Sequence, residues 1–316
     1  MSQEVDKKMI SVIVCSRSLA FFEALQTNIK NTIGVPFEIT RIDNENNTYG
    51  ICKAYNEGAA LAKFSYLCFV HEDVFFQTNN WGSNLVNHFV EDKEVGLIGI
   101  AGAVYKTKMS SGWWHTESGW QEARRMNLVQ HHKNIHKPTQ LITINPFKES
   151  RSQVVSIDGV FMVTKKEDWL QNKFDEKLLK GFHGYDLDFS LHVGQHKKVV
   201  VVYDVLIDHF SGGSYDLDWM KGIMMVHKKW RKHLPVIIKE CDPTAKSIYA
   251  NGWKRLRKNI AFIIEQKPTF LFVLESYHFL FTLLDKKPGK LQTSKDYFRE
   301  LYKTISLFKR SRRSVQ

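Results

Sequence analysis

The stretch Tyr66 to Phe76, YLCFVHEDVFF, decides how the chain is interpreted. Five apolar or aromatic residues, Tyr66 to Val70, run without a break, as expected of a strand buried on both faces of a parallel sheet. His71, Glu72 and Asp73 then follow together before the chain becomes apolar again. Ligands of open α/β sheets bind at the carboxyl ends of strands, where imidazoles and carboxylates can hold a divalent cation. The alternative is a strand end whose polar residues face water.

The residues before this stretch alternate between strand and helix patterns. The predicted elements are a strand at Ile10 to Cys15, a helix at Leu19 to Ile29, a strand at Phe37 to Ile42 and a helix at Ile51 to Lys63. This β-α-β-α-β order is typical of a nucleotide-binding parallel sheet. We therefore expect an α/β fold.

The alternation continues downstream with one gap. We predict a helix at Trp81 to Val90, strands at Val95 to Val104 and Val199 to Ile207, a bent strand pair at Val154 to Thr164, and helices at Lys165 to Gln171 and Gly181 to Val193. The segment from Tyr105 to Arg151 shows little periodicity. A loop of this length in a compact domain is usually functional or mobile.

The last third of the chain is predicted to be helical and is strongly basic. The predicted helices are Trp219 to His233, Ala245 to Gln266, Thr269 to Leu284 and Tyr297 to Phe308. From Trp219 onward there are 22 Lys or Arg and 7 Asp or Glu, a net charge of +15, against +12 for all 316 residues. Such a block favours an anionic partner, either membrane lipid or nucleic acid. Thr269 to Leu284 is apolar but too short to span a bilayer, and it contains Glu275 and His278.

Composition indicates a globular protein, with 43% apolar and 25% charged residues. The four cysteines show neither metal-type nor disulfide-type spacing, and the first residues lack the apolar stretch of a signal peptide. A cytoplasmic location is the expectation.

Five polar motifs, in order along the chain, resemble those of the GT-A glycosyltransferases, specifically the inverting family-2-like group. They are Asp43 after the second strand, Ala54-Tyr55-Asn56-Glu57-Gly58 in a helix, His71-Glu72-Asp73, Gly184-Tyr185-Asp186-Leu187-Asp188, and His209 after a late strand. The resemblance covers roughly Ser11 to Ser214. It implies a GT-A fold, a Rossmann-like and mostly parallel sheet flanked by helices, in residues 1–215. Residues 216–316 then form a basic helical extension that contacts a membrane surface or another subunit.

The resemblance also implies roles for individual residues. Asp186 is the expected catalytic base, and Asp73, His209 and His71 are the expected metal ligands. The expected donor-binding residues are Ser16, Arg17, Asp43, Asn44, Lys53, Asn56 and Glu72. The expected acceptor-binding residues are Trp113, Trp114, Asp158, Gly159 and Asp188, and Trp120 is a further candidate for stacking on a sugar ring.

Three motif positions depart from the family pattern. His71 replaces a carboxylate, so we favour Mn²⁺ over Mg²⁺, because imidazole is a softer ligand. Tyr55 stands where the family often has Arg, and Lys53 or Arg17 is expected to supply the phosphate contact instead. Tyr185 stands where Glu is usual.

The implied reaction is a hexosyltransferase-type transfer from a nucleoside-diphosphate sugar, with a UDP-sugar favoured. The acceptor is a glycan or a lipid-linked glycoconjugate, in a surface-polysaccharide or similar pathway on the inner face of the cell membrane. The expected partners are these substrates, an anionic membrane surface and a second copy of the chain, without nucleic acid.

Three other functions stay open at this point. A nucleic-acid-binding protein would explain the basic C-terminal third, but the chain has no recognised nucleic-acid motif. A nucleotidyltransferase would usually carry a glycine-rich loop after the first strand, and Ser16-Arg17-Ser18 has no glycine. A catalytically inactive relative is the third alternative, because His71 and Tyr185 depart from the family pattern.

Overall fold

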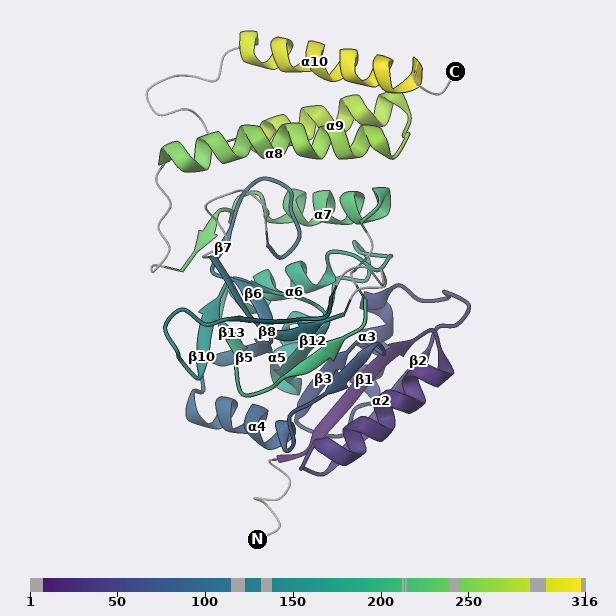
Figure 1. The fold of residues 1–316 in the computed structure, drawn as a ribbon, viewed down its shortest axis with the longest axis vertical. Coiled ribbons are helices and arrows are strands. Elements are labelled where there is room, and N and C mark those ends of the chain that lie inside the picture. Colours follow the sequence, from purple (N-terminus) through teal and green to yellow (C-terminus); the bar gives the residue numbers. More distant parts are fainter. Residues whose placement is uncertain are drawn as a thin grey trace.

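The computed structural model describes residues 8–114, 123–131, 138–211, 213, 215–238, 245–284 and 294–313. In the described part, a layered α/β unit carries a stack of helices formed by the C-terminal third of the chain (Figure 1). The expected α/β architecture with a C-terminal helical region is confirmed.

The main sheet has seven strands in the order β10-β13-β5-β12-β3-β1-β2. Their bounds are β1 Ile10–Ser16, β2 Phe37–Asp43, β3 Tyr66–Val70, β5 Val95–Gly99, β10 Arg151–Val154, β12 Phe161–Lys165 and β13 Lys198–Val202. β1 runs parallel to β2 and β3, and β13 runs parallel to β5. β12 is antiparallel to β3 and β5, and β10 is antiparallel to β13. The predicted N-terminal β-α-β-α-β unit is confirmed. The carboxyl ends of its parallel strands β1, β2 and β3 meet at one edge of the sheet.

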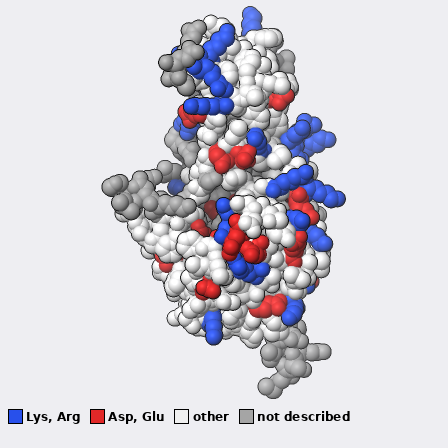
Figure 2. Space-filling view, turned by 90° about the vertical axis from the view of Figure 1, so that its right-hand side faces the viewer, with Lys and Arg blue, Asp and Glu red and all other residues white. Residues whose placement is uncertain are grey.

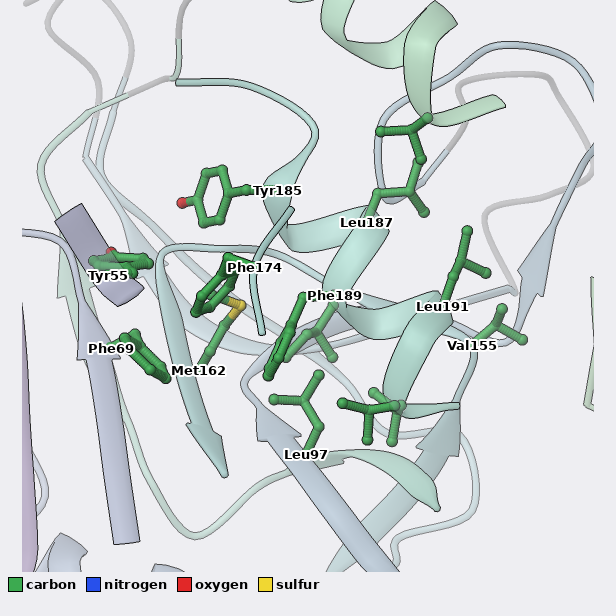
Figure 3. Packing of buried hydrophobic residues seen from close by; sticks show 14 of the residues in the cluster. Tyr55, Phe69, Leu97, Val155, Met162, Phe174, Tyr185, Leu187, Phe189 and Leu191 are labelled. Atoms are coloured by element: carbon green, nitrogen blue, oxygen red, sulfur yellow. The ribbon is translucent and has the colours of Figure 1, made fainter. Parts of the chain in front are cut away.

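Helices cover both faces of this sheet. Successive side chains of a strand point to opposite faces, so a strand of consecutive apolar residues needs a partner on each side. The helices are α2 Leu19–Thr32, α3 Ile51–Leu61, α4 Trp81–Glu91, α5 Lys166–Asn172 and α6 Tyr185–Val193. In β3, Tyr66, Cys68 and Val70 pack in one apolar cluster with α2 and α4. Leu67 and Phe69 pack in the other cluster with α3, α5 and α6 (Figure 3). Both faces of β3 are therefore buried, as its unbroken apolar run predicted.

A second sheet lies against the first and corrects three predictions. Its order is β11-β6-β8-β14-β4, with β9 paired to β8. The bounds are β4 Val74–Phe76, β6 Ala101–Ala103, β8 Arg124–Gln130, β9 Gln140–Ile144, β11 Ser156–Ile157 and β14 Ile207–His209. The predicted strands at Val95 to Val104 and Val199 to Ile207 are each split between the two sheets. The segment from Tyr105 to Arg151 is not one long loop, because β8 and β9 form within it.

Four helices follow the two sheets. They are α7 Leu217–Trp230, α8 Ala245–Glu265, α9 Phe270–Thr282 and α10 Ser294–Arg313, and a short pair joins β7 Tyr105–Lys106 to β15 Val236–Ile237. A third apolar cluster unites α8 and α9 with Met109 and with Met220 of α7. Among the described helices, none combines the length and apolarity needed to cross a membrane.

Candidate active site

His71, Asp73 and His209 come together where the two sheets meet. His71 and Asp73 lie in the turn between β3 and β4, and β4 pairs antiparallel with β14, which places His209 opposite Val74. Asp73 Oδ1 lies 4.0 Å from His71 Nδ1 and 3.9 Å from His209 Nε2. One ligand atom from each residue lies within 4.8 Å of the other two. The expected metal ligands are therefore neighbours, although they are far apart in sequence.

Outer contacts orient both imidazole rings. His71 Nε2 is 2.7 Å from the Tyr185 hydroxyl, so Nδ1 is the nitrogen that faces Asp73. His209 Nδ1 is 3.3 Å from the side-chain oxygen of Gln130, whose amide nitrogen donates to backbone carbonyls. That partner selects the tautomer with a proton on Nδ1 and a lone pair on Nε2. Burial lowers the pKa of His209, which favours the neutral, metal-binding form.

The triad fits a divalent cation. Metal–ligand bonds of about 2.1 Å place the ligand atoms of one ion about 3–4 Å apart. Asp73 Oδ1 lies at the upper end of this spacing from both imidazole nitrogens, and all three ligand atoms lie within 4.8 Å of one another. Two imidazoles and one carboxylate form a donor set that suits Mn²⁺ better than Mg²⁺.

Glu72, the middle residue of the triplet, contacts the turn after β1. One of its carboxylate oxygens accepts hydrogen bonds from the backbone N–H groups of Arg17 and Ser18, both at 3.0 Å. Ser18 caps the N-terminus of α2 through its side chain. Glu72 thus holds the turn after β1, and its predicted role in donor binding stays a prediction.

The remaining predicted donor contacts divide into two groups. Arg17, Asp43 and Lys53 are exposed near the carboxyl ends of β1 and β2. Ser16 and Asn44 are buried and hold backbone together: Asn44 N–H donates to the Ser16 carbonyl, and its side chain bonds both backbone groups of Tyr49. The exposed residues are accessible to a ligand, whereas the buried Ser16 and Asn44 stabilise the backbone at this edge of the sheet.

Asn56 does not reach this edge. Its amide bonds the backbone of Phe174 and the side chains of Trp169 and Glu176. The Ala-x-Asn-x-Gly motif therefore joins α3 to the segment after α5. These contacts give Asn56 a packing role, and its predicted contact with the donor stays a prediction.

Asp186 lies in the first turn of α6, and Asp158 lies between β11 and β12 and lines the same cavity. Gly184 has φ of 81°, a left-handed conformation that glycine adopts without strain, and the helix begins at the next residue. The Asp186 carboxylate accepts from Leu187 N–H at 2.8 Å and from Gly159 N–H at 3.3 Å. Burial, followed by the charge of Asp158, raises the pKa of Asp186 to about 7. A carboxyl group with this pKa is suited to act as a general base near neutral pH.

Tyr185 is a site residue that the sequence did not assign. Its ring packs in the apolar cluster with Tyr55 and Phe174 (Figure 3), while its hydroxyl contacts His71. A Cβ on Gly159 would collide with this ring, so the glycine allows the close approach. In the sequence, the only indication of a role for Tyr185 was its position directly after Gly184, in a motif where Glu is usual.

A cavity of about 600 Å³ opens beside Asp186. Its lining includes His71, Asp158, Gly159, Asp186, Trp113, Trp114, Tyr215 and Trp219, together with Arg255, Lys258, Asn259 and Phe262 of α8. A smaller cavity of about 270 Å³ shares His71 and Asp158 with it and extends to His209. The predicted acceptor residues Trp113, Trp114, Asp158 and Gly159 thus share one cavity with the expected base.

Asp188, the fifth predicted acceptor residue, lies away from the cavity. It is 2% exposed, and its oxygens accept from Lys229 Nζ at 2.8 Å and Trp230 Nε1 at 2.7 Å. It joins α6 to α7, and its predicted contact with the acceptor stays a prediction. Trp120 lies outside the described residues.

Comparisons with known proteins place these features in context. The profile of the "Glycosyltransferase like family" matches residues 11–235. A crystal structure of GalNAc-T7 with UDP, GalNAc and Mn²⁺ aligns with a TM-score of 0.49 and 11% identity, over 71% of this chain and 49% of that one. The structure of A197 from STIV aligns with a TM-score of 0.34 and 12% identity, over 64% of this chain and 85% of that one. No curated protein sequence matches significantly.

Proposed function

Because the chain belongs to the glycosyltransferase-like family, we propose that it is a metal-dependent, inverting glycosyltransferase. It moves a sugar, most simply a hexose, from a nucleoside diphosphate such as UDP to a hydroxyl group of a glycan or glycoconjugate. The observation that carries this proposal is the His71, Asp73 and His209 triad, which borders the cavity that holds Asp186.

On the donor side, the triad binds a divalent cation, with Mn²⁺ preferred. His71, Asp73 and His209 would hold this cation, which would supply positive charge to offset the negative charge that builds on the diphosphate leaving group. Tyr185 and Gln130 keep the two imidazoles in the ligating orientation. The exposed Asp43, Arg17 and Lys53 lie at the same sheet edge and are proposed to contact the nucleotide.

On the acceptor side, Asp186 takes the proton of the attacking hydroxyl group. The hydroxyl oxygen bonds to the anomeric carbon from the face opposite the diphosphate, and the bond from that carbon to the diphosphate oxygen breaks. One displacement inverts the anomeric configuration. The Gly159 N–H holds the carboxylate of Asp186 in place, and the faces of Trp113 and Trp114 offer stacking surfaces for sugar rings.

The direct test is to incubate the protein with Mn²⁺ and a panel of nucleotide sugars and to measure the release of nucleoside diphosphate. The account expects release with one donor class, stimulation by an acceptor, and an inverted anomeric signal in the NMR spectrum of the product. Retention of configuration would contradict the role of Asp186. Nucleotide-sugar binding without any turnover would favour the inactive relative.

We further propose that the helical region of residues 216–316 docks the enzyme on an anionic membrane surface at the cytoplasmic face. α9 and α10 expose large apolar side chains, with Leu271 65%, Phe298 64% and Tyr302 74% exposed. Lys and Arg side chains gather over these helices (Figure 2). Apolar side chains beside cations match an anionic lipid interface, where a lipid-linked acceptor would lie.

A further inference from the structure

One stripe of helix α8 faces the cavity that contains Asp186. Arg255, Lys258, Asn259 and Phe262 all line it. These positions follow an i, i+3, i+4, i+7 pattern, which places them on one face of a helix. A segment of the basic C-terminal third is therefore a wall of the candidate active site.

Packing fixes α8 in this position. The apolar stripe of the helix, including Leu256 and Ile260, is buried in a cluster with Met109 and Met220. Asn259 donates a hydrogen bond of 2.9 Å to the Ser110 carbonyl, in the same loop that carries Trp113 and Trp114. The helix and the aromatic loop thus form one wall.

The two walls of the cavity carry opposite charges. Asp158 and Asp186 project from the α/β unit, whereas Arg255 and Lys258 project from α8. Arg257, between them in sequence, points to α10, where it pairs with Glu300 through two hydrogen bonds of 3.0 Å. Arg257 therefore joins α8 to α10, whereas Arg255 and Lys258 line the cavity.

The two cavities share His71 of the metal triad, but Asp186, Arg255 and Lys258 line only the larger one. The smaller cavity extends to His209 of the metal triad, and no α8 residue lines it in the described part of the chain. The diphosphate of a donor has to lie beside the triad, whereas Arg255 and Lys258 line the part that contains Asp186. The cations thus face the space in which the acceptor hydroxyl meets its base.

An aromatic series connects the two walls. The Tyr215 and Trp219 rings have centroids 5.2 Å apart, and those of Trp219 and Phe262 are 5.9 Å apart. All three residues line the cavity. Aromatic faces pack well against the apolar faces of sugar rings, so an extended glycan can pass from Asp186 toward α8.

We infer that α8 completes the acceptor site, and that Arg255 and Lys258 bind an anionic group on the acceptor glycan, a carboxylate or a phosphate. This inference rests on the proposed function, and it narrows the substrate class to acidic glycans. Guanidinium and ammonium groups form charge-assisted hydrogen bonds with both anions. The acceptor then presents its hydroxyl group to Asp186 and its charge to α8.

The test compares three probes on the full-length protein by tryptophan fluorescence, because Trp113, Trp114 and Trp219 line the cavity. The probes are a disaccharide ending in glucuronic acid, its neutral analogue ending in glucose, and the same neutral disaccharide carrying a 6-phosphate. The variant is Arg255→Gln/Lys258→Gln. The matched control is Lys254→Gln, which removes a cation from an exposed position of the same helix that does not line the cavity.

Wild-type protein is expected to bind at least one anionic probe about 10-fold or more tightly than the neutral one, with the preference weakening as salt rises. The double variant should lose this preference and bind the anionic and neutral probes about equally, whereas the control should retain the preference. The relative affinities of the two anionic probes identify carboxylate or phosphate as the group recognised.

Three results would overturn the inference: equal binding of neutral and anionic probes, the same loss in the control, or weakened UDP binding in the double variant. The last would place the cations on the donor side. UDP binding with Mn²⁺, measured in parallel, separates this inference from the proposed function. Wild-type protein that fails to bind UDP contradicts the proposed function, whereas the comparison of probes tests Arg255 and Lys258 independently.

Discussion

Replacing Tyr185 with phenylalanine removes one hydroxyl group and leaves the packed ring in place. That hydroxyl lies 2.7 Å from His71 Nε2 and is the contact that turns Nδ1 toward Asp73. Losing an outer contact of this kind typically lowers metal affinity by about 10- to 100-fold. This corresponds to about 1.4–2.7 kcal/mol of binding free energy. Calorimetric titration with Mn²⁺ in the presence of UDP measures the change directly.

Tyr55→Phe is the matched control. Tyr55 packs 5.8 Å from the Tyr185 ring in the same cluster, and its buried hydroxyl has no hydrogen-bond partner within the described structure. Removing that hydroxyl should leave Mn²⁺ affinity unchanged and should leave the free energy of unfolding equal or slightly higher. Urea unfolding of both variants checks that the fold is intact. Equal Mn²⁺ affinities for the two variants would refute the positioning role of Tyr185.

Three further predictions concern the base, the helical stack and the membrane. Asp186→Asn should lower turnover by about 10²- to 10⁴-fold with little change in UDP affinity. In the wild-type protein, kcat/KM should fall as the pH drops below about 7, because protonation of Asp186 removes the base. A flat pH profile would point to another base. Glu300→Gln should lower the free energy of unfolding at pH 7 by about 2 kcal/mol, because the pKa of Glu300 is about 2 beside Arg257 and Lys303. In wild type this contribution is present above pH 4.5 and is lost between pH 4.5 and 2, so urea titrations of both proteins should converge at low pH. In vesicle sedimentation, binding of the protein should need anionic lipid, weaken as salt rises and disappear when the residues after Pro268 are removed. If the protein binds no such vesicle at any salt concentration and α9 and α10 are buried between two copies of the chain, the helices form a dimer contact instead.

Local patterns predicted the central strand β3 well because it is apolar on both faces. Tyr66–Val70 matches its predicted bounds for this reason. The same reasoning missed β8, whose sequence RRMNLVQ places Arg125 and Asn127 among its buried side chains. Asn127 is stabilised there by the carbonyls of Tyr203 and Val205, partners that are distant in sequence. A polar strand of this kind is not visible from composition or periodicity.

The motifs located the site, but they did not separate ligands from supporting residues. Asp73 and Glu72 are adjacent acids after the same strand, and only the three-dimensional contacts show that Glu72 holds the β1 turn. The basic residues of α8 resembled a solvated or membrane-facing surface. Their place in the cavity depends on how the helix docks against Met109 and Ser110, which no local pattern encodes.

The central claim is that a cation held by His71, Asp73 and His209 recruits a nucleoside diphosphate to the sheet edge. Calorimetric titration of UDP into wild-type protein, with Mn²⁺ and with EDTA, and into Asp73→Ala tests it most directly. Asp73 Oδ1 lies within 4.0 Å of both imidazole nitrogens, so the account predicts that UDP binding needs Mn²⁺ and disappears in the variant while its unfolding transition is retained. Equal UDP binding with EDTA, or unchanged Mn²⁺-dependent binding in Asp73→Ala, would contradict it.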